Sequence, residues 1–476
     1  MAREVRDRGM RLARAALRLS LCLFTALCAA GCWDRTEVDD LAFIMAIGLD
    51  EAPNDQVYVT FHIAVPRAVA GAGGAGGGSG GGGGGGAGQQ SSLITTLMGR
   101  SVLSLLNLLN THVDRRPSLV HGKMVVIGEK LARRGIAPYI GELVRFREAR
   151  RTMFLAVSQG TAKEFIEKNR PILEQNPAKN LELLALANRQ TGFVPPSQIH
   201  RFLVEMQSLG EEPVAILAGI KEEAPGGRTE QSTGGASGRR DGSPDGGSPA
   251  GGAGTEPPKM PKPPPIHARS DSDYTAGQSP SVGGNPVELL GGAVFRGDRM
   301  VGKITGQDVR AMLMVRGSFK RGTLLLEDPF VKDRYVSCDV RLARPTEISV
   351  NKEGRGFHVK VKIMLEGEVI GSQSLIDYSN PKNLHTLERR VAEDLKRSCE
   401  HIVRKAQREF RADIFAFGNK VRHLTKTWRE WQDLNWPERF PEARVDIDLR
   451  LDLRRTGLLF KPPRPSTQKR SAPERR

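Results

Sequence analysis

Apolar positions along the first half of this chain alternate between the spacings of strands and helices. Short apolar runs, partly interrupted by polar residues at every second position, predict strands. Apolar residues three and four apart predict helices between those strands. The predicted strands lie at 41–49, 57–65, 123–128, 153–157 and 214–220, and helices are predicted at 94–109, at 130–146, from Thr161 onward and at 195–206. This alternation indicates a mixed α/β fold.

The second half has a similar pattern and ends in a strongly alternating strand. Two apolar runs at 289–295 and 300–304 flank a polar turn, which predicts a hairpin. Further predicted elements are a helix at 308–315, strands around 324–326, 334–342, 347–350 and 358–365, and a long helical region at 383–423. Between 445 and 454 every second residue is apolar and the others are charged. One face of that last strand should therefore be buried and the other solvated.

Two segments interrupt these patterns and suggest how the chain is divided. Residues 71–88 are almost entirely Gly and Ala, and 223–287 are rich in Gly, Pro, Ser and charge. Such compositions bury little apolar surface, which predicts a flexible loop and a disordered linker or insertion. The expected organisation is a signal peptide at 1–31, an N-terminal mixed α/β region at 32–222 (one domain plus part of a second), the linker at 223–287, a C-terminal domain at 288–460 and a basic disordered tail at 461–476.

The N-terminus has the pattern of a bacterial export signal followed by a lipid acceptor. Six Arg precede an apolar stretch at 19–30, which is too short to span a bilayer as a helix. Small residues at 29–31 lead to Cys32, an arrangement similar to a lipobox. The thiol of Cys32 is therefore the expected lipidation site, and two acyl chains would anchor the protein durably. The alternative is an ordinary secretory signal with an incidental cysteine.

Composition narrows the function classes only slightly. The chain has 476 residues and a net charge of +17, and its two basic ends contribute much of that excess. Aromatic residues make up 5%, so platforms for stacking nucleic-acid bases are not expected. Beyond the signal and Cys32, the cysteines Cys338 and Cys399 remain. They can form a disulfide or stay as two separate buried thiols, and neither lies in a zinc-binding spacing.

Patterns typical of catalysis are weak or absent in this sequence. Residues 297–303 match the start of a phosphate-binding loop, but Ile304 follows and cannot ligate magnesium. The match also spans the predicted hairpin instead of a strand-to-helix turn. The H-E-x-x-H zinc motif and the G-x-S-x-G nucleophile motif do not occur. The basic run at 145–151 is interpreted as a solvated helix face. No catalytic, cofactor-binding or metal-ligating residue is therefore predicted.

Several motifs, taken in order, resemble the Ger(x)C spore germination lipoproteins, the C subunits of nutrient germinant receptors. The resemblance covers nearly the whole chain after Cys32 except the two low-complexity segments and the tail. It is carried by residues 31–35, 46–50, 121–129, 131–132, 135–136, 145–151, 292–295, 300–302, 413–418, Gln407, Trp428, Trp436, Phe440 and Gly457.

The resemblance implies a non-enzymatic subunit without a cofactor. Its implied fold is three mixed α/β domains, each built around a β-sheet with flanking helices. It implies anchoring through diacylglyceryl-Cys32 on the outer face of the spore inner membrane. Its implied partners are the membrane-embedded A and B receptor subunits and the lipid bilayer, with no nucleic acid, and its implied role is germination in response to nutrients.

A solute-binding lipoprotein of an importer is the main alternative, because it would share the signal and the anchor. Such a protein needs two lobes around a ligand cleft, and the sequence shows neither a paired-lobe repeat nor many aromatics. A secreted hydrolase is a third class, disfavoured by the missing nucleophile and metal motifs.

Overall fold

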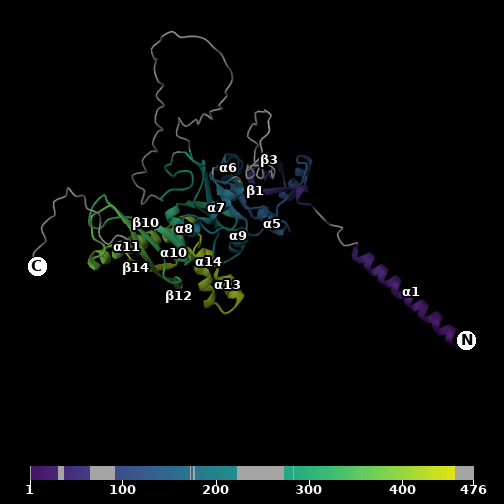
Figure 1. The fold of residues 1–476 in the computed structure, drawn as a ribbon. Coiled ribbons are helices and arrows are strands. Elements are labelled where there is room, and N and C mark those ends of the chain that lie inside the picture. The colour runs from purple at the N-terminus through teal and green to yellow at the C-terminus, as the bar shows by residue number, and fades with distance from the viewer. Residues whose placement is uncertain are drawn as a thin grey trace, which may run out of the picture.

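Two β-sheets form the body of the protein, one of nine strands and one of five, in the part of the chain that the structure describes. This computed structural model describes residues 2–29, 37–64, 92–171, 173–174, 177–221, 273–281, 283–354 and 356–455. The sheets lie next to each other with helices around them, and helix α1 (Ala2–Ala29) stands apart (Figure 1). Within the described ranges, no helix is both long and apolar enough to cross a bilayer.

The first sheet has the strand order β3-β2-β1-β5-β6-β7-β8-β9, and β4 pairs with β1. Its strands are β1 (Leu41–Glu51), β2 (Val57–Ala64), β3 (Ser92–Gly99), β4 (Arg116–Ser118), β5 (Met124–Gly128), β6 (Phe154–Ser158), β7 (Val214–Ile220), β8 (Val287–Arg296) and β9 (Arg299–Ile304). The central strands β1, β5, β6 and β7 run parallel, and the outer hairpins are antiparallel. Strands β5 and β6 are buried at every position because helices cover both faces of the sheet.

Helices divide between those two faces. Val125 and Ile127 of β5 belong to one apolar core, and Met124 and Val126 belong to another. The first core includes side chains of α3, α4, α5 and α9, and the second those of α6 and α7. The helices are α3 (Val102–Leu108), α4 (Glu129–Arg134), α5 (Ala137–Arg145), α6 (Ala162–Lys168), α7 (Pro177–Leu186), α8 (Asn188–Thr191) and α9 (Ile199–Met206).

The second sheet packs one face against helices and exposes the other. Its strands are β10 (Arg321–Glu327), β11 (Tyr335–Leu342), β12 (Glu347–Glu353), β13 (Gly356–Ser372) and β14 (Arg444–Arg455). Strand order is β10-β11-β13-β12, and β14 pairs in parallel with β13. Helices α10 (Gly306–Arg316) and α11 (Pro381–Lys405) share its core. The short helices α12 (Phe417–Val421), α13 (Trp428–Leu434) and α14 (Trp436–Arg439) complete this part.

Several expectations about fold and elements are confirmed. The mixed α/β class is confirmed by two sheets with flanking helices. Strand β14 buries its apolar positions, including Ile447, Leu449 and Leu451, and exposes the alternate charged ones. The predicted hairpin at 289–304 is the β8–β9 pair, with Gly297 at φ +60° in its turn.

Two predicted helices are wrong in part. Residues 94–109 form strand β3 followed by α3, because the whole of β3 pairs with β2 at the sheet edge. The helical region 383–423 ends as α11 at Lys405, and a single wide turn at Ala406–Phe410 follows. Arg411 then has φ +52°, a left-handed conformation that stops the helix.

The resemblance implies a sheet in each of three domains, whereas the described residues form two sheets. Strands β8 and β9 extend the first sheet through pairing with β7, so the described residues form two sheets. Part of the 223–287 segment is also ordered. Tyr274 and Ala276 are buried, and the Ala276 amide donates to the Leu290 carbonyl over 2.9 Å. The rest of that segment, the Gly-rich run 71–88 and the tail 461–476 lie outside the described residues.

Candidate functional site

The two parts of the protein meet where residues 205–213 pack against 411–419. The former segment leads from α9 to β7, and the latter follows α11. The Glu212 amide donates to the Asp413 carbonyl over 2.8 Å. A Cβ on Gly418 would lie 2.6 Å from the Gly210 Cα, so the two backbones touch. We call this contact, with the side chains that line it, the junction.

Asp413 organises the C-terminal side of the junction. Its carboxylate accepts hydrogen bonds from the Phe415 amide (3.0 Å), the Gly418 amide (2.8 Å) and the Trp436 indole Nε1 (2.8 Å). Ala416 has φ +64°, which bends the loop around the carboxylate. Burial raises the pKa of Asp413 to about 6, and the three donors oppose that rise. One buried side chain therefore holds the loop, α12 and α14 together.

Aromatic side chains surround this carboxylate. Trp436 packs edge-on against Phe357, with ring centroids 5.6 Å apart, and Phe415 stacks on Phe417. Phe440 lies beside both Phe415 and Phe417. The Gln407 amide donates to the Phe440 and Ala443 carbonyls at 3.1 and 2.7 Å. Gln407, residues 413–418, Trp436 and Phe440, which carried part of the sequence resemblance, thus form one buried unit.

Arg316 links α10 to the N-terminal side of the junction. Its Nη2 lies 2.7 Å from Glu205 Oε1 and 2.5 Å from Glu211 Oε2. Its Nη1 donates to the Ile414 carbonyl over 3.4 Å. All three charged side chains are largely buried, and Asn419 Nδ2 donates to the other Glu211 oxygen. These contacts cross between the two parts of the chain.

Glu212 meets the turn that resembled a phosphate-binding loop. Its Oε2 accepts from the Gly297 amide over 2.7 Å, so a carboxylate already occupies the position where a phosphate would lie. Lys303 of the same pattern pairs with Glu129 over 2.7 Å. Burial raises the pKa of Glu212 to about 7, the Gly297 amide and Arg296 oppose this, and Asp413 adds to it. Residues 297–303 therefore serve packing and not nucleotide binding.

These raised pKa values predict that the contribution of Glu212 and Asp413 to stability falls as pH rises from about 5 to 7. The folded state holds protons on Glu212 and Asp413 that the unfolded chain has already released above pH ~4.5. Protonated Glu212 alone contributes about 3 kcal/mol of stability below pH 4.5, which is lost progressively as pH rises to about 7. Urea unfolding of the Glu212→Gln variant should therefore show a flatter pH profile than wild type. The exposed Glu442→Gln variant is the matched control, and identical profiles for Glu212→Gln and wild type would contradict this origin.

The remaining residues singled out from sequence are placed as follows. Cys32, the expected lipidation site, lies outside the described residues. Cys338 on β11 and Cys399 on α11 are both free and buried, and burial raises the pKa of each thiol to about 12. The basic side chains of the run 145–151 are exposed at the end of α5 and in the turn that follows.

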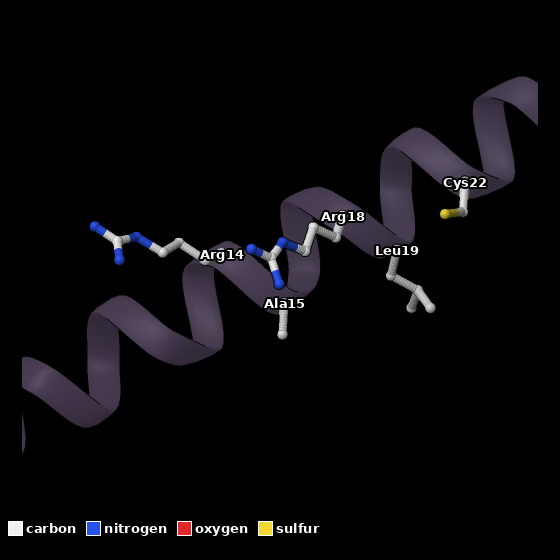
Figure 2. A pocket seen from close by; sticks show the side chains of 5 residues that line it. All are labelled: Arg14, Ala15, Arg18, Leu19 and Cys22. Atoms are coloured by element: carbon white, nitrogen blue, oxygen red, sulfur yellow. The ribbon is translucent and has the colours of Figure 1, made fainter.

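Two surface hollows do not have the character of a ligand site. The first lies along α1, and Figure 2 shows its lining side chains, Arg14, Ala15, Arg18, Leu19 and Cys22, projecting from this one helix. The second, of about 340 Å³, lies on the exposed face of the five-stranded sheet. Its charges already pair, Arg321 with Asp339 and both Arg341 and Arg454 with Glu366. Among the described residues, no group of His, Cys, Asp or Glu side chains can hold a metal ion.

Sequence reasoning missed the N-terminal half of the junction. Arg316, Glu205, Glu211 and Glu212 carry no known motif, and single charges of this kind usually lie in solvent. One local signal existed. Two adjacent acidic residues directly precede Pro213 and the fully apolar strand β7. Such a short connection to a buried strand keeps these acids close to the protein interior.

The fold and the junction define a class of protein: two α/β parts joined by buried polar contacts that stabilise structure. Two family profiles match this chain. "Spore germination protein N-terminal domain" matches residues 34–220, and "Spore germination B3/ GerAC like, C-terminal" matches residues 290–457. The chain belongs to this family of spore germination proteins, which confirms the resemblance found in the sequence.

Similar proteins span nearly the same length as this chain. "Putative spore germination protein YfkR" of Bacillus subtilis (strain 168) is 22% identical over 92% of this chain and 96% of its own. "Spore germination protein KC" of the same organism is 25% identical, covering 95% and 98%. A solved structure, "Crystal Structure of the GerBC protein", is 14% identical with a TM-score of 0.46, covering 86% of this chain and 96% of that one.

Proposed function

We propose that this chain is the lipid-anchored, non-catalytic C subunit of a nutrient germinant receptor in a bacterial spore. The observation that carries the proposal is the order of its parts. An apolar export segment ends at Cys32, the N-terminal family domain begins two residues later, and the C-terminal family domain follows. Relatives of nearly full length are named spore germination proteins KC and B3.

Cys32 supplies the anchor in this proposal. Its thiol forms a thioether with diacylglycerol, and the cysteine becomes the N-terminus once residues 1–31 are removed. The six Arg before the apolar segment keep the start of the signal in the cytoplasm, so Cys32 emerges on the outer face of the spore inner membrane. Each buried CH₂ of the acyl chains adds ~0.8 kcal/mol to membrane binding.

The partners in this proposal are membrane-embedded A and B subunits of the receptor. A lipid tether holds the folded domains at high effective concentration beside proteins in the same membrane. The buried acids described here have structural roles that fit a subunit without catalysis. Asp50, for example, accepts from the Ala162 and Lys163 amides at the start of α6, and Asp328 accepts from the Ser374 and Tyr378 hydroxyls.

Spores carrying Cys32→Ala test the proposal. We expect the protein to leave the inner-membrane fraction and the nutrient response to slow by roughly tenfold or more, because the effective concentration beside the partners is lost. Cys22→Ala is the matched control, since Cys22 lies in the removed segment, and it should germinate normally. Normal germination of Cys32→Ala spores, with the protein still in the membrane fraction, would overturn the anchor.

A further inference from the structure

An exposed tryptophan marks the helical tip formed by residues 419–430. This tip comprises the end of α12, the turn Arg422–Leu424 and the start of α13, and α13 lies at the periphery of the molecule (Figure 1). The side chain of Trp428 is 55% exposed and Leu424 is 48% exposed. Trp431 and Trp436, by contrast, are 3% and 1% exposed. The tip therefore presents a large aromatic ring where the fold does not need one.

The charge of the tip is strongly one-sided. Four basic residues, Lys420, Arg422, Lys426 and Arg429, stand against the single acid Glu430. All four are exposed. The Arg422 guanidinium lies over the Trp428 ring at 5.1 Å, which leaves its donors available at the surface.

Ion pairing distinguishes the tip from the basic surface of the five-stranded sheet. On the five-stranded sheet, Arg321, Arg341 and Arg454 each pair with a carboxylate. At the tip, the described side chains make no ion pair with those four basic residues, and the Glu430 carboxylate accepts instead from the Lys426 backbone amide over 2.8 Å. A cluster of unpaired cations beside exposed apolar side chains complements a partner with negative charge at its surface and an apolar layer directly below that charge.

We propose that this tip binds the surface of an anionic lipid bilayer. Trp428 and Leu424 lie at the level of the headgroups, where the amphipathic indole ring is most stable. Lys420, Arg422, Lys426 and Arg429 lie beside lipid phosphates, each adding to the electrostatic attraction. This contact is separate from the anchor at Cys32. It gives the protein a second point of attachment to the membrane and therefore fixes the protein's orientation there.

Chain length makes the two attachments compatible. Four residues lie between Cys32 and Glu37, the first described residue of the folded part, and the five residue steps that join them span at most about 17 Å when fully extended. A protein tethered at Cys32 therefore keeps the start of its folded part close to the bilayer, which is compatible with a second contact to lipid. This argument rests on the proposed lipid anchor, whereas the exposure and charge of the tip do not.

Quenching of Trp428 by brominated lipids tests the proposal locally. The full chain with Trp33→Phe is mixed with phosphatidylcholine vesicles that contain phosphatidylglycerol and brominated acyl chains. We expect quenching of the exposed fluorescence, weaker quenching as salt rises, and its loss in the conservative Trp428→Phe variant. Adding Cys32→Ala should leave the quenching unchanged, which separates this contact from the anchor.

Two charge variants test whether the basic residues of the tip cause the binding to anionic vesicles. Replacing Lys420, Arg422, Lys426 and Arg429 together by Gln should reduce quenching to its level on vesicles of phosphatidylcholine alone. The matched control replaces four exposed arginines of the run 145–151, at positions 145, 147, 150 and 151, by Gln, and it should quench like wild type. Unquenched Trp428 on anionic vesicles that bind the chain, or equal losses in the two variants, would overturn the proposal. Urea unfolding of each variant checks that the fold is intact.

Discussion

Replacing Asp413 by alanine is expected to lower the free energy of unfolding by about 3 kcal/mol. The substitution leaves the Phe415 amide, the Gly418 amide and the Trp436 indole without their acceptor inside the protein. Each buried unpaired donor costs about 1–3 kcal/mol. The variant also removes a carboxyl whose burial is unfavourable, as its raised pKa shows, so the loss is smaller than the sum.

Urea unfolding at pH 7 measures this effect. Asp413→Asn keeps one acceptor oxygen and should lose about half as much stability as Asp413→Ala. The matched control is Asp452→Ala on the exposed face of β14, which should stay within about 0.5 kcal/mol of wild type. An Asp413→Ala variant as stable as that control would show that Asp413 does not hold the loop.

Replacing Arg316 by leucine should cost about 3–5 kcal/mol, the range measured when one partner of a buried ion pair is removed. Glu205 and Glu211 would remain as charges with most of their surface away from water and with their shared cation gone. Glu205 keeps Arg201 at 2.7 Å, whereas Glu211 keeps only the Asn419 amide among the described contacts. The penalty therefore falls mainly on Glu211.

A second substitution separates lost charge from lost packing. In the Arg316→Leu background, Glu211→Gln removes the uncompensated charge and should recover about 1–2 kcal/mol. Arg344→Leu is the matched control, because among the described residues Arg344 makes a single, exposed ion pair, with Glu347 at 3.7 Å, and its loss should cost less than about 1 kcal/mol. Equal losses for Arg316→Leu and Arg344→Leu would contradict the role of Arg316 at the junction.

The two family domains share a sheet, which makes the junction more than a surface contact. The C-terminal family match begins at residue 290, inside β8, yet β8 and β9 pair with the first sheet. A cut between the two matches would leave the edge of β7 unpaired and expose apolar side chains such as Val294 and Phe295 to solvent. The two parts are therefore expected to behave as one cooperative unit.

Local patterns predicted much of the fold where one physical cause dominates. The alternation of apolar and charged residues in β14 predicts a strand with one solvent-exposed face, and the polar turn at 296–299 predicts a hairpin. A helix is predicted from Thr161 onward, and the Thr161 hydroxyl caps α6 by accepting from the Glu164 amide over 3.2 Å. The prediction of one helix over 94–109 was wrong because these apolar residues also suit an edge strand. Pairing with β2 determines that the first part of this segment is strand β3.

By itself, the sequence determined the family, the mixed α/β class and the residues 413–418 that carry the resemblance, since motif order and periodicity are properties of the chain alone. Only the tertiary structure decided that Asp413 binds Trp436, that Arg316 pairs with Glu205 and Glu211, and that β8–β9 extends the first sheet. These contacts join residues far apart along the chain. Burial makes an unpaired charge energetically costly, so these residues are paired in the folded protein. Pairing between distant residues produces no pattern in the local spacing of apolar and polar residues.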